Sequence, residues 1–199
     1  MDNDMKSFEY WFDFGSPAAY LAFTQLQKLE ADTNSKAVYR PMLLGGVFQA
    51  TGNQSPASVP AKGAYTFKDF DRFAKRYGVP FNSNPYFPIN TLLLMRGAMG
   101  MQQKEPERFL VYCKAVFQAI WVEALNMNDP ATVGAILHNA GFDPQSLMTL
   151  ANETPIKEAL KAATTEAVAR GVFGAPTFSV GALMFSGQDE LDFVKEALQ

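Results

Sequence analysis

Ser16 is the residue of this sequence best placed to take part in chemistry, because a predicted strand changes into a predicted helix at this point. Aromatic residues alternate with Glu9, Trp11 and Asp13 over residues 8–14, which is the period-two pattern of a strand although Trp11 breaks the polarity, and the pattern stops at Gly15. Ser16-Pro17 then has the form of a helix start, with serine as the N-cap and proline in the first turn. Ligands of α/β sheets bind outside the carboxyl ends of strands, and helix amino termini favour anions. Ser16 is therefore a candidate ligand contact, although an N-cap serine is common without any further role.

The sequence contains one cysteine, Cys113, and one histidine, His138, and these counts exclude several kinds of chemistry. A single chain can form no disulfide, no CxxC redox pair and no cysteine-rich zinc site. A serine hydrolase centred on Ser16 is also excluded, because the surrounding residues do not form G-x-S-x-G and His138 lies within a distant predicted helix. Cys113 lies on the apolar face of its predicted helix and is expected in the core, whereas His138 is expected on the surface.

Length and composition indicate one folded domain that carries a large insertion. The chain has 199 residues, of which 48% are hydrophobic and 19% charged, and this is ample for a core without disulfides or metals. The net charge is −3 and the basic residues are scattered, so we expect no nucleic-acid partner. No apolar stretch approaches the length of a membrane span, and residues 1–7 are polar and acidic where a signal peptide would be basic and then apolar. We therefore expect a soluble cytoplasmic protein.

The predicted elements follow the order strand, helix, strand, a block of helices, and then two strands and a helix. A second strand over residues 37–41 would form a parallel β-α-β unit with the first. Residues 51–62 are rich in Gly, Ser and Pro and predict a long loop, either functional or disordered. Residues 177–180 and 183–186 form a predicted hairpin, and the last helix begins at Gln188. Helical patterns cover about 67–77, 88–102 and 106–123, and three further helices should start at the capping pairs Asp129-Pro130, Asp143-Pro144 and Thr154-Pro155.

Aromatic residues on the predicted helices could line a ligand site, but their spacing favours the core. Phe67, Phe70, Phe73 and Tyr77 share one face of a predicted helix, the usual pattern of a packed face. Trp121, near the end of its helix, could line a cavity where the helical block meets the sheet. For all of these residues, ordinary packing is the preferred interpretation.

Several segments together resemble the 2-hydroxychromene-2-carboxylate isomerases and the kappa-class glutathione transferases. The run FDFGSP at residues 12–17, followed by Tyr20-Leu21, is similar to the opening of these proteins. The similar segments keep their order and spacing over nearly the whole chain. The others are Arg40-Pro41 with Gly45, Gly52-Asn53, Pro60, Lys62-Gly63-Ala64-Tyr65, the run GVFGAPT at residues 171–177, and Gly187-Gln188-Asp189.

This resemblance implies an α/β fold with a thioredoxin-like core of the DsbA type and a large all-helical insertion. The core would comprise residues 1–62 and 172–199, and the insertion residues 63–171. Dithiol oxidoreductases of this fold carry cysteines at the positions held here by Ser16 and Ala19, so the thiol must come from outside this chain. The resemblance implies that glutathione supplies it, with its sulfur beside the Ser16 hydroxyl, where donors at a helix start lower the pKa of a thiol.

The resemblance also implies how glutathione is held. Pro176 would follow a cis peptide bond, so that Ala175 presents its backbone to the cysteinyl backbone of glutathione, and Asp189 would attract the γ-glutamyl ammonium group. Asn53 and Lys62 could reach glutathione or an acidic substrate from the long loop. The predicted set has Ser16 as the catalytic residue and a cofactor contact, with Pro17, Asn53, Lys62, Ala175, Pro176, Gln188 and Asp189 as further cofactor contacts.

Three residues depart from the family pattern, and they bear on the predicted function. Ala18 stands where an aromatic residue is usual and should enlarge or reshape the substrate pocket, Glu190 where an arginine is common, and Ser186 where an aromatic residue is frequent. The implied function is glutathione-dependent isomerisation of a small aromatic enone carboxylate, as in aromatic hydrocarbon catabolism. A kappa-class-like transferase or peroxidase and a non-catalytic module that binds thiol peptides are the alternatives, and a homodimer is left open.

Overall fold

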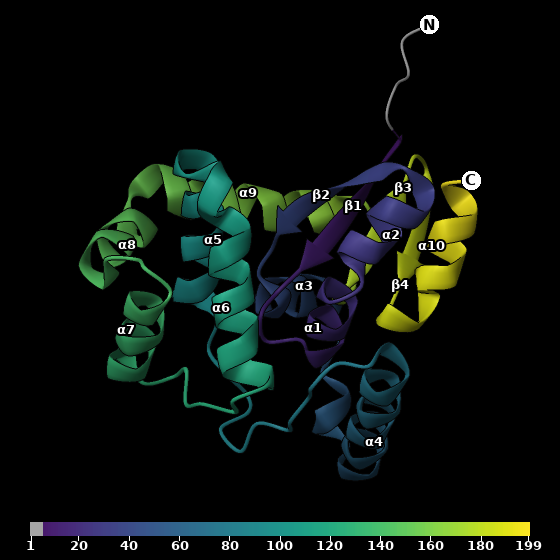
Figure 1. The fold of residues 1–199 in the computed structure, drawn as a ribbon, viewed down its shortest axis with the longest axis horizontal. Coiled ribbons are helices and arrows are strands. Elements are labelled where there is room, and N and C mark those ends of the chain that lie inside the picture. Colours follow the sequence, from purple (N-terminus) through teal and green to yellow (C-terminus); the bar gives the residue numbers. More distant parts are fainter. Residues whose placement is uncertain (1–5) are drawn as a thin grey trace, which may run out of the picture.

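The computed structural model describes residues 6–199 and contains a four-stranded sheet in the order β2-β1-β3-β4 (Figure 1). β1 (Lys6–Phe12) pairs in parallel with β2 (Ser35–Pro41) and antiparallel with β3 (Thr177–Val180). β4 (Leu183–Ser186) completes the predicted hairpin with β3. The parallel pair predicted from the first two strands is confirmed, and β1 lies in the interior of the sheet.

The connection from β1 to β2 consists of two helices where a single helix was predicted. α1 (Pro17–Phe23) and α2 (Leu26–Thr33) are separated at Thr24 and Gln25. The Gln25 N–H bonds the carbonyl of Ala22 at 2.9 Å, three residues back, which tightens the turn and interrupts the α-helical pattern. Asn34, with a φ of 51°, ends α2 in the left-handed conformation before β2 begins.

The segment predicted as a long loop is largely helical. α3 (Leu44–Thr51) was not predicted, η1 (Pro56–Ser58) forms a short turn, and α4 (Pro60–Tyr77) begins within the expected loop. α3 has no side-chain cap at Leu43 and contains adjacent glycines, so the sequence lacked the usual signals of a helix. α4 ends at Gly78 in the left-handed conformation, as predicted.

A block of helices follows α4 and returns the chain to the sheet at β3. Asp129 and Asp143 cap two of these helices with their side chains, as predicted, but Thr154 does not cap the next one. That helix has Glu153 at its N-cap, without a side-chain hydrogen bond, and Thr154 is its first residue. The elements are α5 (Leu92–Lys104), η2 (Pro106–Arg108), α6 (Phe109–Trp121), α7 (Pro130–Asn139), α8 (Pro144–Asn152) and α9 (Thr154–Ala169), and after β4 the chain closes with η3 (Gln188–Glu190) and α10 (Leu191–Ala197).

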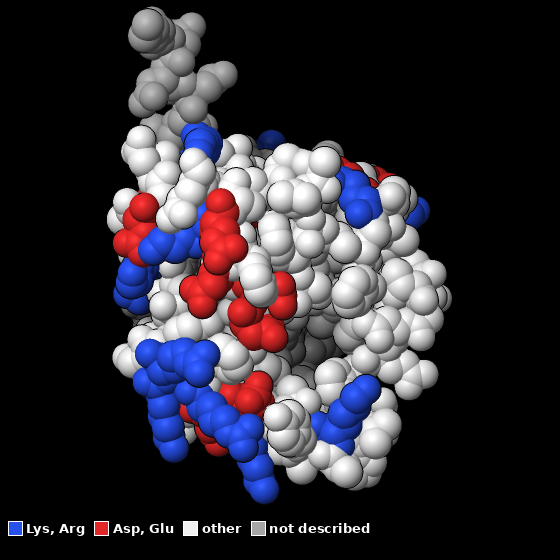
Figure 2. Space-filling view, turned by 90° about the vertical axis from the view of Figure 1, so that its right-hand side faces the viewer, with Lys and Arg blue, Asp and Glu red and all other residues white. Residues whose placement is uncertain are grey.

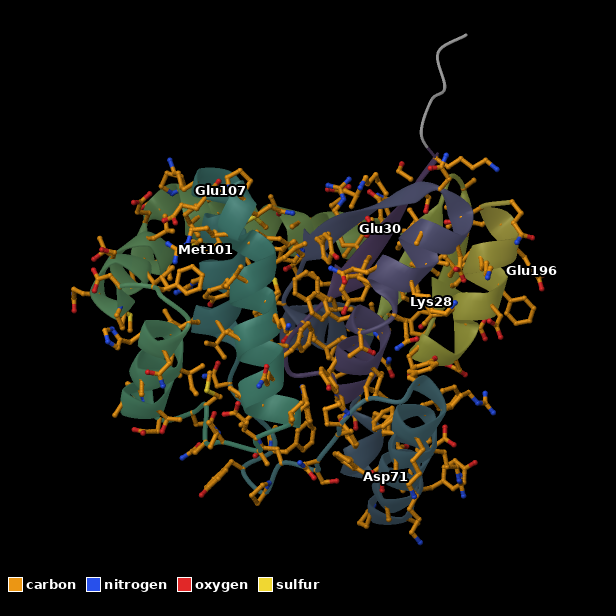
Figure 3. The ribbon with its side chains drawn as sticks, viewed as in Figure 1. Lys28, Glu30, Asp71, Met101, Glu107 and Glu196 are labelled. Atoms are coloured by element: carbon orange, nitrogen blue, oxygen red, sulfur yellow. The ribbon has the colours of Figure 1, made fainter. Side chains whose placement is uncertain are left out.

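Both faces of β1 are buried, although its residues alternate in polarity. On one face Tyr10 and Phe12 stack at a centroid distance of 5.2 Å within the main core, which extends into α5 and α6. On the other face Trp11 is fully buried between the guanidinium groups of Arg40 and Arg170, which also bond Glu9. In Figure 3 Glu107 and Glu196 lie at the edge of the view, and Met101 of α5 lies among packed side chains.

The architecture confirms the predicted class, an α/β sheet with a helical block inserted between β2 and β3. The proposed domain boundary between residues 62 and 63 falls in the first turn of α4, and the division of the chain at 63–171 stays a prediction. Cys113 and Trp121 are buried in the core and His138 is exposed, as predicted. Within residues 6–199, no helix has both the length and the apolar composition needed to cross a bilayer.

Candidate active site at the end of β1

A cavity of about 810 Å³ lies at the carboxyl end of β1. Its wall includes the residues that follow β1, the start of α3, the first half of α4 and the segments that flank β3 and β4. Figure 2 shows the molecular surface hollowed above the basic side chains of α4. Seven of the eight predicted site residues line this cavity: Ser16, Pro17, Asn53, Lys62, Ala175, Pro176 and Gln188.

Ser16 is the N-cap of α1, and its hydroxyl also reaches across to the segment before β3. The hydroxyl accepts a hydrogen bond from the Ala19 N–H at 3.1 Å and donates one to the carbonyl of Ala175 at 2.7 Å. The residue is only 5% exposed, yet it lines the cavity. The serine therefore caps a helix and also connects the two backbone segments that the sequence placed 159 residues apart.

The segment before β3 presents backbone groups to the cavity. The bond between Ala175 and Pro176 is cis, as the resemblance implied. Within the described part of the chain, the Ala175 N–H makes no hydrogen bond, so this donor is available to a ligand. Asn53 also holds this segment, because its side-chain amide donates to the Phe173 carbonyl at 2.7 Å.

Asp13 is a buried polar residue of the site that the sequence analysis did not single out. Its carboxylate accepts hydrogen bonds from the Gly15 N–H at 2.8 Å, the Thr91 hydroxyl at 2.6 Å and the Leu44 N–H at 2.8 Å. Gly15 lies in the loop before α1, Thr91 directly precedes α5, and Leu44 is the first residue of α3. Asp13 thus fastens together three of the elements that form the cavity wall.

The surroundings of Asp13 shift the pKa of its carboxyl group. Burial raises the pKa of the Asp13 carboxyl above its ordinary value, against the opposing effect of the hydrogen bonds from Thr91, Gly15 and Leu44. The side chain is 1% exposed. The only sequence signal for this role was an acidic residue within a strongly apolar strand region, and that signal does not indicate which donors surround it.

The remaining lining mixes apolar and polar side chains and carries one cation. Lys62 of α4 is the only basic residue of the cavity wall, and it makes no ion pair with any other described residue. Phe67 and Phe70 pack in or against the main core, as preferred from the sequence, and they also line the cavity. Phe73 and Tyr77 do not line it, and Tyr77 donates from its hydroxyl to the Gln188 carbonyl at 2.8 Å.

Gln188 and Asp189 take different positions at the far end of the cavity. Gln188 is 5% exposed and lines the cavity, and its side-chain amide has no hydrogen-bond partner among residues 6–199. Asp189 is exposed and borders a separate depression beside Tyr77. Its carboxylate lies so close to Gly187 that a Cβ added there would overlap it. Asp189 therefore does not line the cavity, but its carboxylate lies against Gly187, which does.

Comparison with known proteins places this geometry in a family. A family model described as a DSBA-like thioredoxin domain matches residues 8–199. A curated 2-hydroxychromene-2-carboxylate isomerase from Sphingobium xenophagum is 28% identical over 97% of this chain and 98% of that protein. A glutathione S-transferase kappa 1 from Caenorhabditis elegans is 25% identical over 96% of this chain and 90% of that protein.

Solved structures agree with the sequence relatives. A structure of 2-hydroxychromene-2-carboxylate isomerase has a TM-score of 0.85 at 26% identity and covers 96% of this chain and 94% of its own. A probable DsbA oxidoreductase from Streptomyces coelicolor has a TM-score of 0.74 at 18% identity and covers 97% of this chain, which shows the shared fold alone.

Proposed function

This chain belongs to the DsbA-like thioredoxin family, and from that premise we propose that it is a glutathione-dependent isomerase of the 2-hydroxychromene-2-carboxylate isomerase type. The observation that carries the proposal is the Ser16 hydroxyl, which bonds the Ala175 carbonyl at the edge of a large cavity, in a chain whose only cysteine is buried elsewhere. Relatives named as isomerases and as kappa-class transferases support an enzyme that acts on a small molecule.

The groups around Ser16 are suited to a thiol-bearing peptide. The free Ala175 N–H and the carbonyl beside it offer one donor and one acceptor, the pair that an extended peptide backbone needs. The unpartnered amide of Gln188 lies at the far end of the cavity, where it offers hydrogen bonds to the polar end of a peptide. The exposed carboxylate of Asp189 lies outside the cavity wall, next to Gly187, and would attract a terminal ammonium only at the cavity edge. Glutathione is a peptide of this kind, and the described residues fit it.

The chemistry that glutathione would supply when bound is a thiolate that adds to one carbon of the conjugated C=C bond, so that this bond becomes single and can rotate before the thiolate leaves and the double bond forms again. Ser16 serves this chemistry as a donor. Its proton now points to the Ala175 carbonyl, and a peptide N–H paired with that carbonyl would free the proton for a thiolate. A hydrogen bond to the charged form stabilises it and lowers the pKa of the thiol.

The other lining residues select the substrate. Lys62 places a single positive charge in a cavity whose wall also includes the aromatic side chains of Phe67, Phe70 and Phe87, a combination that suits an aromatic ring with one carboxylate. Ala18 leaves room beside Ser16 where relatives of this type carry an aromatic residue. Asn53 acts indirectly, because it holds the Phe173 carbonyl and thereby the backbone that leads to Ala175.

Replacement of Ser16 tests the proposal, because a matched serine lies in the same cavity. Ser55 also precedes a proline, caps a short turn by accepting from the Ala57 N–H, and lines the cavity. We expect Ser16→Ala to lower glutathione-dependent turnover of 2-hydroxychromene-2-carboxylate about 100-fold, the usual effect of removing one donor from a developing charge. Ser55→Ala should keep the wild-type rate, and a wild-type rate for Ser16→Ala would contradict the assigned role.

A kappa-class-like transferase is the second candidate, because relatives with that name match nearly as well as the isomerases. The glutathione balance separates the two: an isomerase leaves its concentration unchanged, and a transferase consumes one molecule for each product. A binding module without catalytic activity would bind glutathione in a calorimetric titration but turn over no enone. Absence of glutathione binding would contradict all three functions.

A further inference from the structure

A second cavity, of about 450 Å³, lies between α5, α7 and α8 in the helical block (Figure 1). It shares no lining residue with the cavity at Ser16. The two are neighbours, because Ile89 and Thr91 line the first cavity while Asn90 and Leu92 line the second. The start of α5 is thus a wall with a different cavity on each side.

The floor of the second cavity is apolar and has no free polar group. Leu94, Met127, Leu137 and Leu147 are each at most 7% exposed. Tyr112 also lines the floor, but its hydroxyl already donates to the Leu94 carbonyl at 2.9 Å. A ligand that fills this floor must therefore present an apolar body.

Arg96 is the only charged side chain that lines the second cavity. It is half-buried, and it has neither an ion pair nor a side-chain hydrogen bond with any residue of the described chain. Arg96 also borders a groove with Lys157, Lys161 and Glu158 of α9, so its surroundings carry a net positive charge. A guanidinium that is partly removed from water without a partner favours an anion, and a carboxylate matches its geometry.

We propose that the second cavity binds a small monocarboxylate with an apolar body, whose carboxylate pairs with Arg96 and whose body covers the apolar floor. The proposal goes beyond the function assigned to the cavity at Ser16 and requires no glutathione. A volume of about 450 Å³ is within the range of small-molecule sites.

Octanoate is a suitable probe, because it has a charged head and an apolar body but neither the ring nor the enone of the proposed substrate. Its binding to glutathione-free protein is measured by calorimetry for the wild type and three variants. Arg96→Gln removes the charge. Gly134→Leu fills the cavity from α7, where an added Cβ would meet nothing nearer than the Pro144 Cβ at 3.9 Å. Lys62→Gln is the matched control, because it removes the single cation of the other cavity.

We expect saturable binding of octanoate to the wild type and to Lys62→Gln. Arg96→Gln should weaken it by about tenfold or more, the usual effect of losing a charge-assisted bond. Gly134→Leu should abolish it, and octan-1-ol, which has the same body without the charge, should bind more weakly and independently of Arg96. Circular dichroism and the unfolding temperature verify that each variant is folded.

Three results would overturn the proposal. Loss of octanoate binding in Lys62→Gln with retention in Arg96→Gln would place the anion in the cavity at Ser16. A change of molar mass in solution for Gly134→Leu, with octanoate binding intact, would mean that a second copy of the chain covers this face. Absence of saturable binding to the folded wild type would contradict the proposal directly. None of these results affects the Ser16 assignment, since no assay contains glutathione.

Discussion

The cavity at Ser16 lies where strand ends and loops meet, whereas the cavity at Arg96 lies between three helices. The first collects a buried carboxylate, a free backbone N–H and several side-chain amides. The second has an apolar floor and one guanidinium at its rim. Both have a single cation, Lys62 in one and Arg96 in the other, and both are lined by side-chain amides, so the first differs by its buried carboxylate and its free backbone N–H.

This difference follows from how each kind of element uses its backbone groups. Residues inside helices bond their own N–H and C=O groups, so a cavity between helices receives polar atoms only from side chains. Loops at strand ends leave backbone groups for other partners, and here Ala175, Gly15 and Leu44 direct theirs to the cavity wall. This is why we propose a site for a peptide thiol at the sheet and a site for an apolar body in the helical block.

The largest effect should come from removing the carboxylate at the first cavity. Asp13→Ala leaves three buried donors without an acceptor, and we expect a loss of about 3 kcal/mol in the free energy of unfolding. Asp129 is the matched control, because it caps α7 beside the second cavity with a half-buried carboxylate. Urea unfolding should show a distinctly smaller loss for Asp129→Ala, and equal losses would mean that Asp13 does not hold the wall together.

A smaller effect should distinguish the two cations during turnover. If the substrate carboxylate lies beside Lys62, Lys62→Gln should raise KM about fivefold with little change in kcat, the effect of losing a contact worth about 1 kcal/mol. Arg96→Gln should leave both constants unchanged in steady-state assays. A higher KM for Arg96→Gln, with no change for Lys62→Gln, would mean that the substrate binds in the second cavity and not beside Lys62.

The smallest effect concerns the pH dependence of the free energy of unfolding, which has opposite signs for Asp13 and Asp129. Burial raises the pKa of Asp13 in the folded state, so its stabilising contribution is complete below its ordinary pKa of 3.8 and is lost as pH rises through the folded value. Hydrogen bonds from Thr132 lower the pKa of Asp129, so its contribution is present above 3.8 and is lost as pH falls through the folded value.

Unfolding measured between pH 3 and pH 7 should therefore separate the two carboxyls. The cost of Asp13→Asn, relative to the wild type, should shrink as pH rises, whereas the cost of Asp129→Asn should grow. The same sign for both variants would contradict the raised pKa of Asp13.

Local patterns predicted most elements of this fold, and their failures have local causes. Asp129 and Asp143, each followed by proline, predicted helix starts because a side-chain cap and a fixed φ act within one turn. α3 was missed because it has no cap and contains adjacent glycines, so packing against α9 and the Asp13 bond to Leu44 stabilise it. The break between α1 and α2 was missed because no proline or glycine marks it.

The candidate site was predicted in part. Family-like segments indicated Ser16, Ala175 and Pro176, and the structure brings them together through one hydrogen bond. Asp13 was not singled out, because its partners lie at Gly15, Leu44 and Thr91, up to 78 residues away. The cavity at Arg96 had no sequence signal, since its lining residues are spread over four helices and their connections.

By itself the sequence determined which chemistry this chain lacks and where its strands and most helices begin. One cysteine excludes dithiol exchange within the chain, and the helix-capping pairs and the alternating strand residues are signals that act over a few positions. Only the tertiary structure decided which backbone groups stay free, which carboxyl is buried and where two cavities form. Those properties depend on contacts between segments distant in the chain, and burial changes the free energy of a charge or a hydrogen bond only after those segments have packed.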